Sequence, residues 1–420
     1  MREPTPRHPA VERHGQVVLF MIFLCMLGGR YDLGRLSPGL EGIDAQAVGV
    51  IAVFFTWAMW WPVARQWTSA SGGLSTPLVW FTMLWIYLGC STLWAPEAAR
   101  TVGPLVNVVT LMVLTWLAAS VASRLSAPSL RSVWTWLLLA GAIYLLAALS
   151  AGAGLGGRFS AFGGGPNVFV RVMVLAAIAA LYFGTARRSR LVFLILLPVF
   201  MVGAVLSGSR GGLVAAAVVG VVGTWPVAKR MSTKAKLLVL VTGGVGALAA
   251  PKLIGAELNL LVVDRYSQLT SGQLRNSDRS HIATLAIDLW HRSPIVGNGL
   301  DSFYALGGSA QYVGHPHNLL LAVTAEGGLV ATALLAAALG SFFWAATRQR
   351  PVATDALFAL LAAGCILVAS MFSGDYYDSR FMWFFLVLAV AHVMKARNGA
   401  TAPDESPQES RTNRARLSIG

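Results

Sequence analysis

Two histidines stand close together near residue 316 of this 420-residue chain, immediately before a long apolar run. His315 and His317 flank Pro316, and Asn318 follows them at the start of that run. Histidine is the side chain best suited to accept a proton near neutral pH, so the pair is a candidate general base. Glu326 lies about two helical turns beyond Asn318, close to the same helix face, where its charge would act on the site. The alternatives are a histidine that caps a helix end and a metal site, for which a third ligand is missing nearby.

Arginines beside glycines or helix starts form a second group, suited to holding an anion. Arg210 lies in the segment SGSRGG (207–212), where a guanidinium beside exposed backbone N–H groups can grip a diphosphate. The alternative is a snorkelling arginine in a tight turn whose glycines allow close helix packing. Arg279 falls in the first turn of a predicted amphipathic helix, where the helix N-terminus already favours anions.

Two more arginines flank the glycine-rich segment RFSAFGGGPN (158–167), which ends in Asn167. Arg158 begins this segment, and Arg171 lies about one turn into the apolar span that follows. An isolated charge in such a span costs roughly 2.5 to 3.5 kcal/mol, so Arg171 should have a partner or line a wet cavity. Substrate binding and a structural salt bridge with Asp375 or Asp378 are equally compatible with this position.

The elements that must position these residues are membrane helices. Hydrophobic residues make up 56% of the chain and charged residues 12%, and the mean hydropathy of +0.64 excludes a soluble domain. Backbone groups in lipid must be hydrogen-bonded within their own segment, which predicts an all-α polytopic membrane protein with about 12 transmembrane helices. The predicted spans are 16–29, 46–63, 77–93, 102–120, 132–150, 167–184, 191–206, 212–227, 237–254, 318–346, 355–373 and 380–394.

The net charge of +14 follows the positive-inside rule and does not indicate nucleic-acid binding. With a cytoplasmic N-terminus, the inside segments collect most of the 32 Lys and Arg residues but a minority of the 18 acids. We therefore predict that both termini are cytoplasmic. Cys25, Cys90 and Cys365 each fall in an apolar run, so they predict no disulfide framework.

The longest connection between spans is the predicted place of function, because loops of this length are usually functional. We predict an N-terminal transmembrane bundle over 1–254, a periplasmic loop over 255–317, C-terminal transmembrane helices over 318–396 and a disordered cytoplasmic tail over 397–420. Within the loop, Ile282, Ala286 and Leu289 repeat at helical spacing until Pro294. This pattern predicts an amphipathic helix that lies on the membrane surface.

Four motifs in this order resemble the O-antigen ligase and polymerase family of bacterial envelope proteins. They are RFSAFGGGPN (158–167), SGSRGG (207–212), SDRSHI (277–282) followed by RSPIVGNGLDSF (292–303), and HPHNLLLAVTAEGG (315–328). The resemblance covers most of the chain from Arg158 onward. It implies a membrane-embedded, metal-independent, inverting glycosyltransferase that takes a glycan from undecaprenyl diphosphate at the outer face of the inner membrane. Arg210 and Arg279 would then grip the donor diphosphate, and His317 would deprotonate the acceptor hydroxyl.

The other candidate residues would support the substrates, namely His315, Arg158, Arg171, Asn167, Asn318 and Glu326. No cofactor is implied, since the outer segments carry no clustered acids suited to Mg²⁺. The implied partners are a lipid-linked glycan donor, a lipid or glycan acceptor such as the lipopolysaccharide core on lipid A, and membrane lipids.

Three other functions remain as alternatives. A polymerase, which joins one lipid-linked repeat to another, is the alternative within the family. A transporter would show internal repeats and charged groups deep in the spans, and a scaffold would not need His317.

Overall fold

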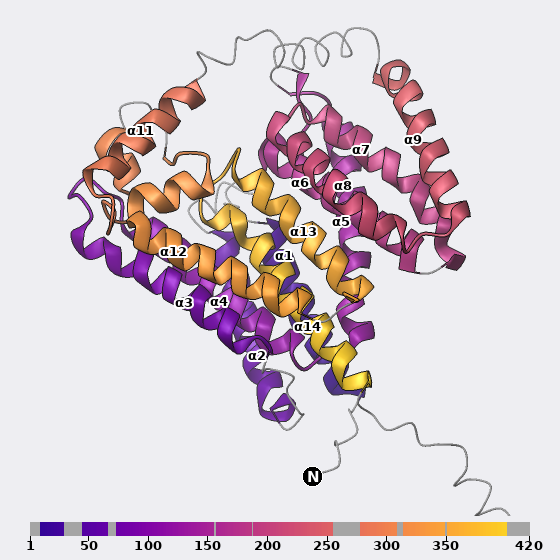
Figure 1. Cartoon of the computed structure of the whole chain (residues 1–420), viewed down its shortest axis with the longest axis horizontal. Coiled ribbons are helices and arrows are strands. Elements are labelled where there is room, and N and C mark those ends of the chain that lie inside the picture. Colours follow the sequence, from indigo (N-terminus) through magenta and orange to yellow (C-terminus); the bar gives the residue numbers. More distant parts are fainter. Residues whose placement is uncertain are drawn as a thin grey trace, which may run out of the picture.

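The computed structural model describes residues 9–28, 44–65, 73–154, 157–186, 188–254, 278–308, 314–348 and 351–400. Within these ranges the chain folds into helices without a strand element (Figure 1). Short 3-10 helices are η4 (Ser91–Trp94), η6 (Arg188–Ile195) and η10 (Tyr377–Ser379), and η8 (Tyr304–Gly308) is π-helical. The α-helices are α1 (Pro9–Gly28), α2 (Ala45–Ala64), α3 (Ser75–Cys90), α4 (Val102–Ala122), α5 (Ala127–Ala151), α6 (Gly165–Ala186), α7 (Leu196–Leu206), α8 (Arg210–Ala228), α9 (Thr233–Ile254), α11 (Asp278–Arg292), α12 (Leu319–Thr347), α13 (Thr354–Ser370) and α14 (Arg380–Ala400).

The predicted all-α membrane fold is confirmed. Nine helices of the described ranges are long and apolar enough to cross a membrane, and the segments Val192–Leu206 and Thr354–Ser370 are shorter apolar helices. Each of the predicted spans falls on a helix, with α9 in the place of the span 237–254. α5 begins at Ala127 rather than at 132, because Ser126 caps the helix by accepting a hydrogen bond from the backbone N–H of Ser129.

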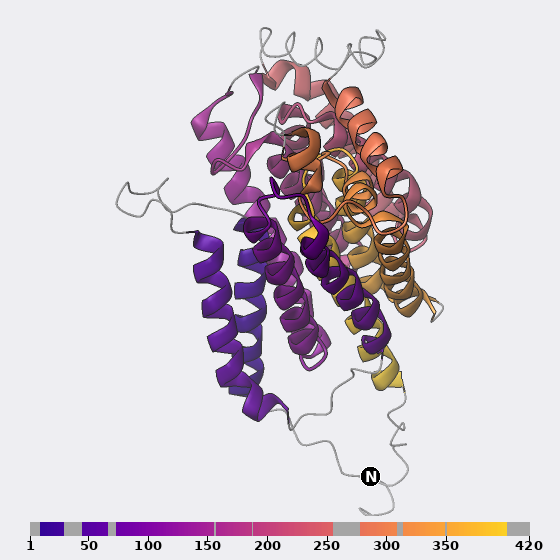
Figure 2. The ribbon, with the colours of Figure 1, turned by 90° about the vertical axis from the view of Figure 1, so that its left-hand side faces the viewer.

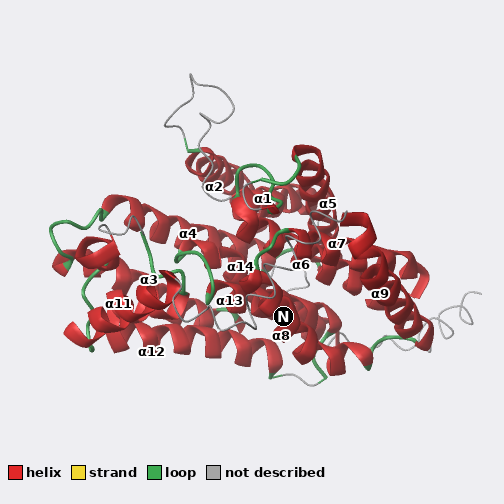
Figure 3. Ribbon diagram, turned by 90° about the horizontal axis from the view of Figure 1, so that it is seen from above, coloured by secondary structure: helices red, strands yellow, loops and turns green. Residues whose placement is uncertain are grey.

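Two helices form the centre of the bundle. Buried residues make up 83% of the apolar window of α6 and 89% of that of α14, against 17% for α2. α14 packs against α4, α12 and α13, and α6 packs against α5, α7 and α13 (Figure 3). α2 lies at the edge of the bundle beside α1 (Figure 2). The C-terminal helices α12–α14 therefore pack directly on helices of the first half of the chain, while the division at residue 254 stays a prediction.

A polar cluster joins α5, α6 and α13. The Arg131 guanidinium donates to Asp355 Oδ2 at 2.8 Å, and the Tyr182 hydroxyl donates to Asp355 Oδ1 at 2.6 Å. Because these groups satisfy one another inside an apolar bundle, they avoid the penalty of a buried unpaired charge. The cluster fixes the three helices at the bundle end where the loop between α12 and α13 lies.

The long connection after α9 contains the predicted amphipathic helix, which is α11. Its apolar residues Ile282, Ala286 and Leu289 are buried against Ala325 of α12 and against Phe303, which precedes η8. The apolar face of this helix is thus used in packing against protein, and its position at the membrane surface stays a prediction. Residues 255–277 and 309–313 of the predicted loop lie outside the described residues. α14 continues to Ala400, past the predicted span end at 394, and residues 401–420 of the predicted tail lie outside the described residues.

A break in α12 creates a docking place for the segment that follows α11. Gly328 has φ 62° and ψ −160° inside the helix, so the hydrogen-bonding pattern is interrupted there. Residues 294–299 run along the break. The backbone N–H groups of Asn298 and Gly299 donate to the carbonyls of Ala325 and Glu326, at 3.2 and 2.9 Å. In return, the N–H groups of residues 329 and 330 donate to the carbonyls of residues 294 and 295. This exchange satisfies backbone groups that the break would leave without partners.

Candidate active site

The candidate general base lies at the N-terminus of α12. Asn318 caps the helix, since its Oδ1 accepts a hydrogen bond from the backbone N–H of Leu321 at 3.0 Å. Its Nδ2 donates to the carbonyl of Met371 at 3.0 Å, which ties the helix start to the turn after α13. His317, directly before the cap, has φ 54°. A residue other than glycine in this left-handed region carries strain, and such strain is concentrated at functional sites.

The two histidines share one side of this segment, as predicted. Their ring centroids are 4.4 Å apart in an edge-to-face arrangement. Partial burial lowers the pKa of His317, and together with the charges of His315 and Arg279 it brings this pKa to about 4. His317 is therefore neutral at physiological pH and able to accept a proton.

The candidate anion-binding residue Arg210 begins α8. Ser209 caps this helix by accepting from the backbone N–H of Gly212, and its hydroxyl donates to Asn167 Oδ1 at 2.8 Å. Side chains added at Gly211 and Gly212 would meet Phe372 and Val170, so these glycines allow close helix packing, as the alternative interpretation of SGSRGG expected. The packing places the half-buried Arg210 at a capped helix N-terminus, where the backbone already favours anions.

The glycine-rich segment after α5 is fastened to the same turn. Arg158 Nε donates to the carbonyl of Ser207 at 3.2 Å, and the backbone N–H of Phe159 donates to the carbonyl of Leu206 at 3.1 Å. Asn167, at the other end of the segment, holds Ser209. The motifs RFSAFGGGPN (158–167) and SGSRGG (207–212) are thus in direct contact.

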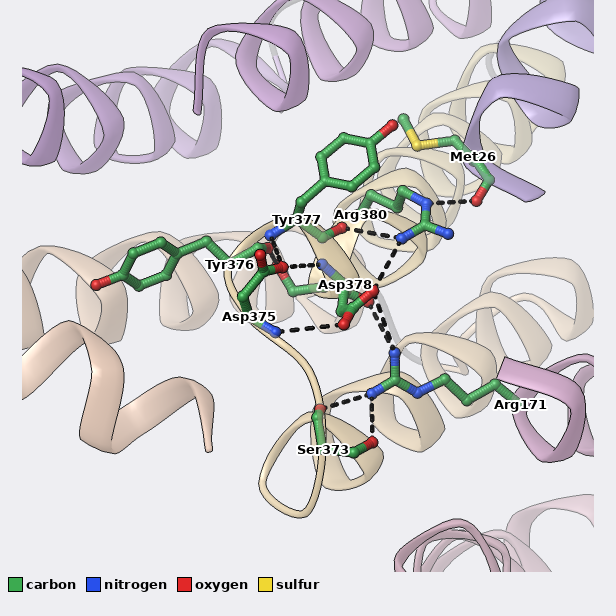
Figure 4. Close-up of polar contacts among 9 residues, drawn as sticks. Met26, Arg171, Ser373, Asp375, Tyr376, Tyr377, Asp378 and Arg380 are labelled. Atoms are coloured by element: carbon green, nitrogen blue, oxygen red, sulfur yellow. Dashed lines mark hydrogen bonds and ion pairs between the residues drawn. The ribbon is translucent and has the colours of Figure 1, made fainter. Parts of the chain in front are cut away.

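The guanidinium of Arg171 is hydrogen-bonded to the turn between α13 and α14 (Figure 4). Its Nη2 donates to the backbone carbonyl of Ser373 at 2.7 Å and to the Ser373 hydroxyl at 3.0 Å. Its Nη1 lies 4.0 Å from Asp378 Oδ1, and Arg380 approaches the same oxygen at 3.3 Å. Because the side chain of Arg171 is only 9% exposed, this geometry favours a structural role for it over direct contact with a substrate.

The turn from Met371 to Arg380 connects the separate parts of the site. Asn318 at the start of α12 bonds to Met371, and Gly211 of α8 packs on Phe372. The side chain of Arg279 is exposed in the first turn of α11, and its charge acts on the imidazole of His317. The N-termini of α8 and α12 thus flank one turn, and Arg279 lies within electrostatic range of the candidate base.

A cavity of about 400 Å³ opens beside His315. His315 and Glu326, both proposed from the sequence, contribute to its lining. The Glu326 carboxylate accepts a hydrogen bond from the Tyr376 hydroxyl at 2.6 Å. The other lining residues include Arg100, Asn107, Asp301 and Asp375.

The structure also bears on the alternative of a metal site. In the described ranges, no group of three or more His, Cys, Asp or Glu side chains is arranged to hold a metal ion. His315 and His317 therefore have no third ligand of these types among the described residues.

Comparison with known families identifies the segment that carries most of these residues. Residues 192–336 match the model of the O-antigen ligase family. This segment resembles an O-antigen ligase domain. A search of the curated proteins finds no match to the chain. The predicted family resemblance is confirmed, and with it the broader assignment to a family of membrane glycosyltransferases.

The matched segment contains Arg210, Arg279, His315, His317 and Glu326. It ends within α12, so the turn that joins the site together lies outside the matched segment. Arg158, Asn167 and Arg171 precede the matched segment, and the structure connects all three to it or to that turn.

Sequence reasoning missed Arg100, Asp301 and Tyr376 as members of the site. Arg100 and Asp301 form an ion pair at 3.0 Å, although they are far apart in the chain. The signal for Asp301 was available in RSPIVGNGLDSF, where an acid follows two glycines. No signal pointed to Arg100, which is a single basic residue after an apolar span.

Proposed function

We propose that this protein transfers a glycan from undecaprenyl diphosphate to a hydroxyl of the lipid A-core acceptor, at the periplasmic face of the inner membrane. The observation that carries this proposal is the neutral His317 in strained backbone at a helix start, within range of Arg279. The N-terminus of α8, which carries Arg210, flanks the same turn. Fixed cations and a neutral imidazole are the two kinds of group that the transfer requires.

In the proposed reaction, His317 accepts the proton of the acceptor hydroxyl as its oxygen attacks the anomeric carbon of the donor sugar. The bond from that carbon to the diphosphate oxygen breaks, and undecaprenyl diphosphate leaves with the electron pair. Attack from the face opposite the leaving group inverts the anomeric configuration. Arg210 and Arg279 stabilise the charge that develops on the diphosphate, so the proposed chemistry uses no divalent metal.

Binding of the donor also changes the pKa of His317. A protonated His317 is disfavoured in the free protein partly by the positive charge of Arg279. A dianionic diphosphate bound to Arg279 offsets that charge and raises the pKa of the imidazole. Its proton affinity is therefore highest when the donor is in place.

The first test replaces the proposed base. Purified protein in lipid nanodiscs is incubated in EDTA with lipid-linked glycan and either lipid A-core or a second lipid-linked glycan. We expect His317→Ala to lower the transfer rate by at least about 100-fold, because general-base catalysis contributes that much. His281→Ala is the matched control, since His281 is exposed on α11. Transfer at the wild-type rate by His317→Ala would contradict the proposal. The acceptor that is extended distinguishes a ligase from a polymerase.

The second test concerns the proposed diphosphate clamp. We expect Arg210→Lys and Arg279→Lys each to weaken donor binding and to lower turnover by roughly tenfold or more, because an ammonium cannot reproduce a bidentate guanidinium. Arg292→Lys, at the opposite end of α11, is the control for a charge-conserving change. Unchanged donor affinity and turnover in both variants would argue against the clamp.

A further inference from the structure

One part of the cavity beside His315 is formed by a sequence motif that has no role in the proposed transfer reaction. RSPIVGNGLDSF contributes residues 294–299, which dock into the break of α12, and then Asp301, which lines the cavity. Asn298 reinforces the docking, since its Nδ2 donates to the carbonyls of Leu289 at 2.7 Å and Ala325 at 2.9 Å. The motif therefore holds one wall of the cavity against α11 and α12.

The wall carries an ion pair whose acidic partner is buried. The Asp301 side chain is 4% exposed, and its two oxygens accept from Arg100 Nε at 3.2 Å and Nη2 at 3.0 Å. The backbone N–H of Arg100 donates to the same carboxylate at 2.8 Å. The guanidinium also lies over the ring of Tyr304, 3.5 Å from its centroid. Arg100 is thus fixed by Asp301 and Tyr304, and its charge is balanced locally.

Two further acids line the cavity. The Glu326 side chain is buried, and its carboxylate accepts from the Tyr376 hydroxyl. Asp375, the residue before Tyr376, also lines the cavity. Three carboxylates therefore face a space that contains one arginine, which is already paired with one of them.

Backbone strain is concentrated around the cavity. In the described ranges, three residues other than glycine have positive φ, and two of them are Asp301 at 63° and His317 at 54°. Asp301 lines the cavity, and His317 contacts His315 at its rim. Such strain persists only where the surrounding structure enforces it, and it marks sites whose geometry matters for function.

We propose that this cavity binds the acceptor glycan, and that it selects a sugar that is neutral or carries an amine at the position entering the cavity. This inference rests on the proposed transferase function. A volume of about 400 Å³ falls in the range of small-molecule sites. Carboxylates and the Asn107 amide are suited to hydrogen-bond sugar hydroxyls, and carboxylates also pair with an ammonium.

Charge separates the two substrates. The donor diphosphate requires cations, which are Arg210 and Arg279 in the proposed mechanism. A phosphate in the cavity would face Glu326 and Asp375, while the charge of Arg100 is already balanced by Asp301, and like charges at short range in a partly desolvated space repel strongly. His315 connects the cavity to the proposed base, since it lines the cavity and contacts His317. An acceptor sugar in the cavity would therefore present its hydroxyl toward the base.

The test measures binding of the acceptor glycan to the full-length protein without donor, and then acceptor and donor KM in the transfer assay. We expect Asn107→Leu and Glu326→Gln to weaken acceptor binding and raise acceptor KM by about tenfold, with donor KM within about twofold of wild type. Val106→Ala, an exposed neighbour on α4, is the control and should change neither value. Wild-type acceptor affinity in both cavity variants, or an effect on donor KM alone, would overturn the inference.

A second measurement tests the charge selection. Phosphate-free core oligosaccharide and the same oligosaccharide phosphorylated on its acceptor sugar compete with the acceptor for binding. The unphosphorylated form should compete at least about tenfold better, and Glu326→Gln should reduce this preference. Equal competition by both forms would refute the selection. Because binding is measured without donor, failure of the transferase proposal would appear separately, as acceptor binding without transfer.

Discussion

His317 combines two properties that are unusual for a surface histidine. Its backbone is held in the left-handed region, and its pKa is lowered to about 4 by burial and by its neighbours. Both properties arise from its position between His315 and the capping residue Asn318, which the turn after α13 fixes in place. The imidazole is consequently neutral at physiological pH and is oriented by structure outside its own helix.

The lowered pKa predicts the pH dependence of transfer. Since protonation removes the base, kcat/KM should be constant from pH 8 to about 5 and should fall near the free-protein pKa of about 4. As the pH is lowered, kcat should begin to fall at a higher pH than kcat/KM does, because bound diphosphate raises the pKa of His317 in the complex. Initial rates over this range, at low and at saturating donor, measure both profiles. An acid limb of kcat/KM at the ordinary histidine pKa, near 6.5, would contradict the assignment.

The break in α12 is the element that organises the site. It frees the carbonyls of Ala325 and Glu326 for hydrogen bonds from the 294–299 segment, and that segment leads to Asp301. Gly328 adopts φ 62° at the break, and a side chain there would meet the backbone of Ile295. The path of α12 therefore depends on a residue without a side chain at this position.

Gly328→Ala should destabilise the protein by about 1–3 kcal/mol, because alanine is strained at positive φ and its Cβ would displace the docked segment. Gly340→Ala in the same helix is the matched control. Gly340 has open space around its Cβ position, so alanine there should leave stability unchanged or raise it slightly. Thermal unfolding of both variants in the same detergent measures the difference. Equal unfolding temperatures for the two variants would show that the break does not depend on Gly328.

At the scale of the whole molecule, the proposed reaction requires the site to face the periplasm. The turn before α4 lies at the end of the bundle that carries the cavity, since Arg100 pairs with Asp301. The start of α9 lies one span away from the capped start of α8, and so belongs to the opposite end. Basic residues gather around it, at Lys229, Arg230, Lys234 and Lys236, as expected for a cytoplasmic face.

Single cysteines test this orientation in a protein whose native cysteines are replaced by serine. Ala98→Cys, before α4, should react with a membrane-impermeant maleimide added to spheroplasts. Thr233→Cys, at the start of α9, should react only after the membrane is permeabilised. Both positions are exposed, so a difference in labelling reports the side of the membrane. The reverse pattern would place the site at the cytoplasmic face and overturn the proposed periplasmic transfer.

The helices and the candidate residues could be predicted because their signals are local. Apolar runs long enough to cross a bilayer specify helices wherever they occur in lipid. Asn318 before α12 and Ser209 before α8 mark helix starts by a hydrogen bond within one turn of their own position. The family motifs that contain His317, Arg210 and Arg279 are likewise continuous segments of sequence.

The sequence by itself thus determined the helical membrane fold, the family and the residues proposed for chemistry. Only the tertiary structure decided which charges meet. Arg171 is held by Ser373 and Asp378, Arg100 by Asp301, and Glu326 by Tyr376. The physical reason is that a charge in an apolar bundle must find a partner, while the partner's position depends on how helices distant in sequence pack. The packing that provides those partners also forms the cavity beside the proposed base.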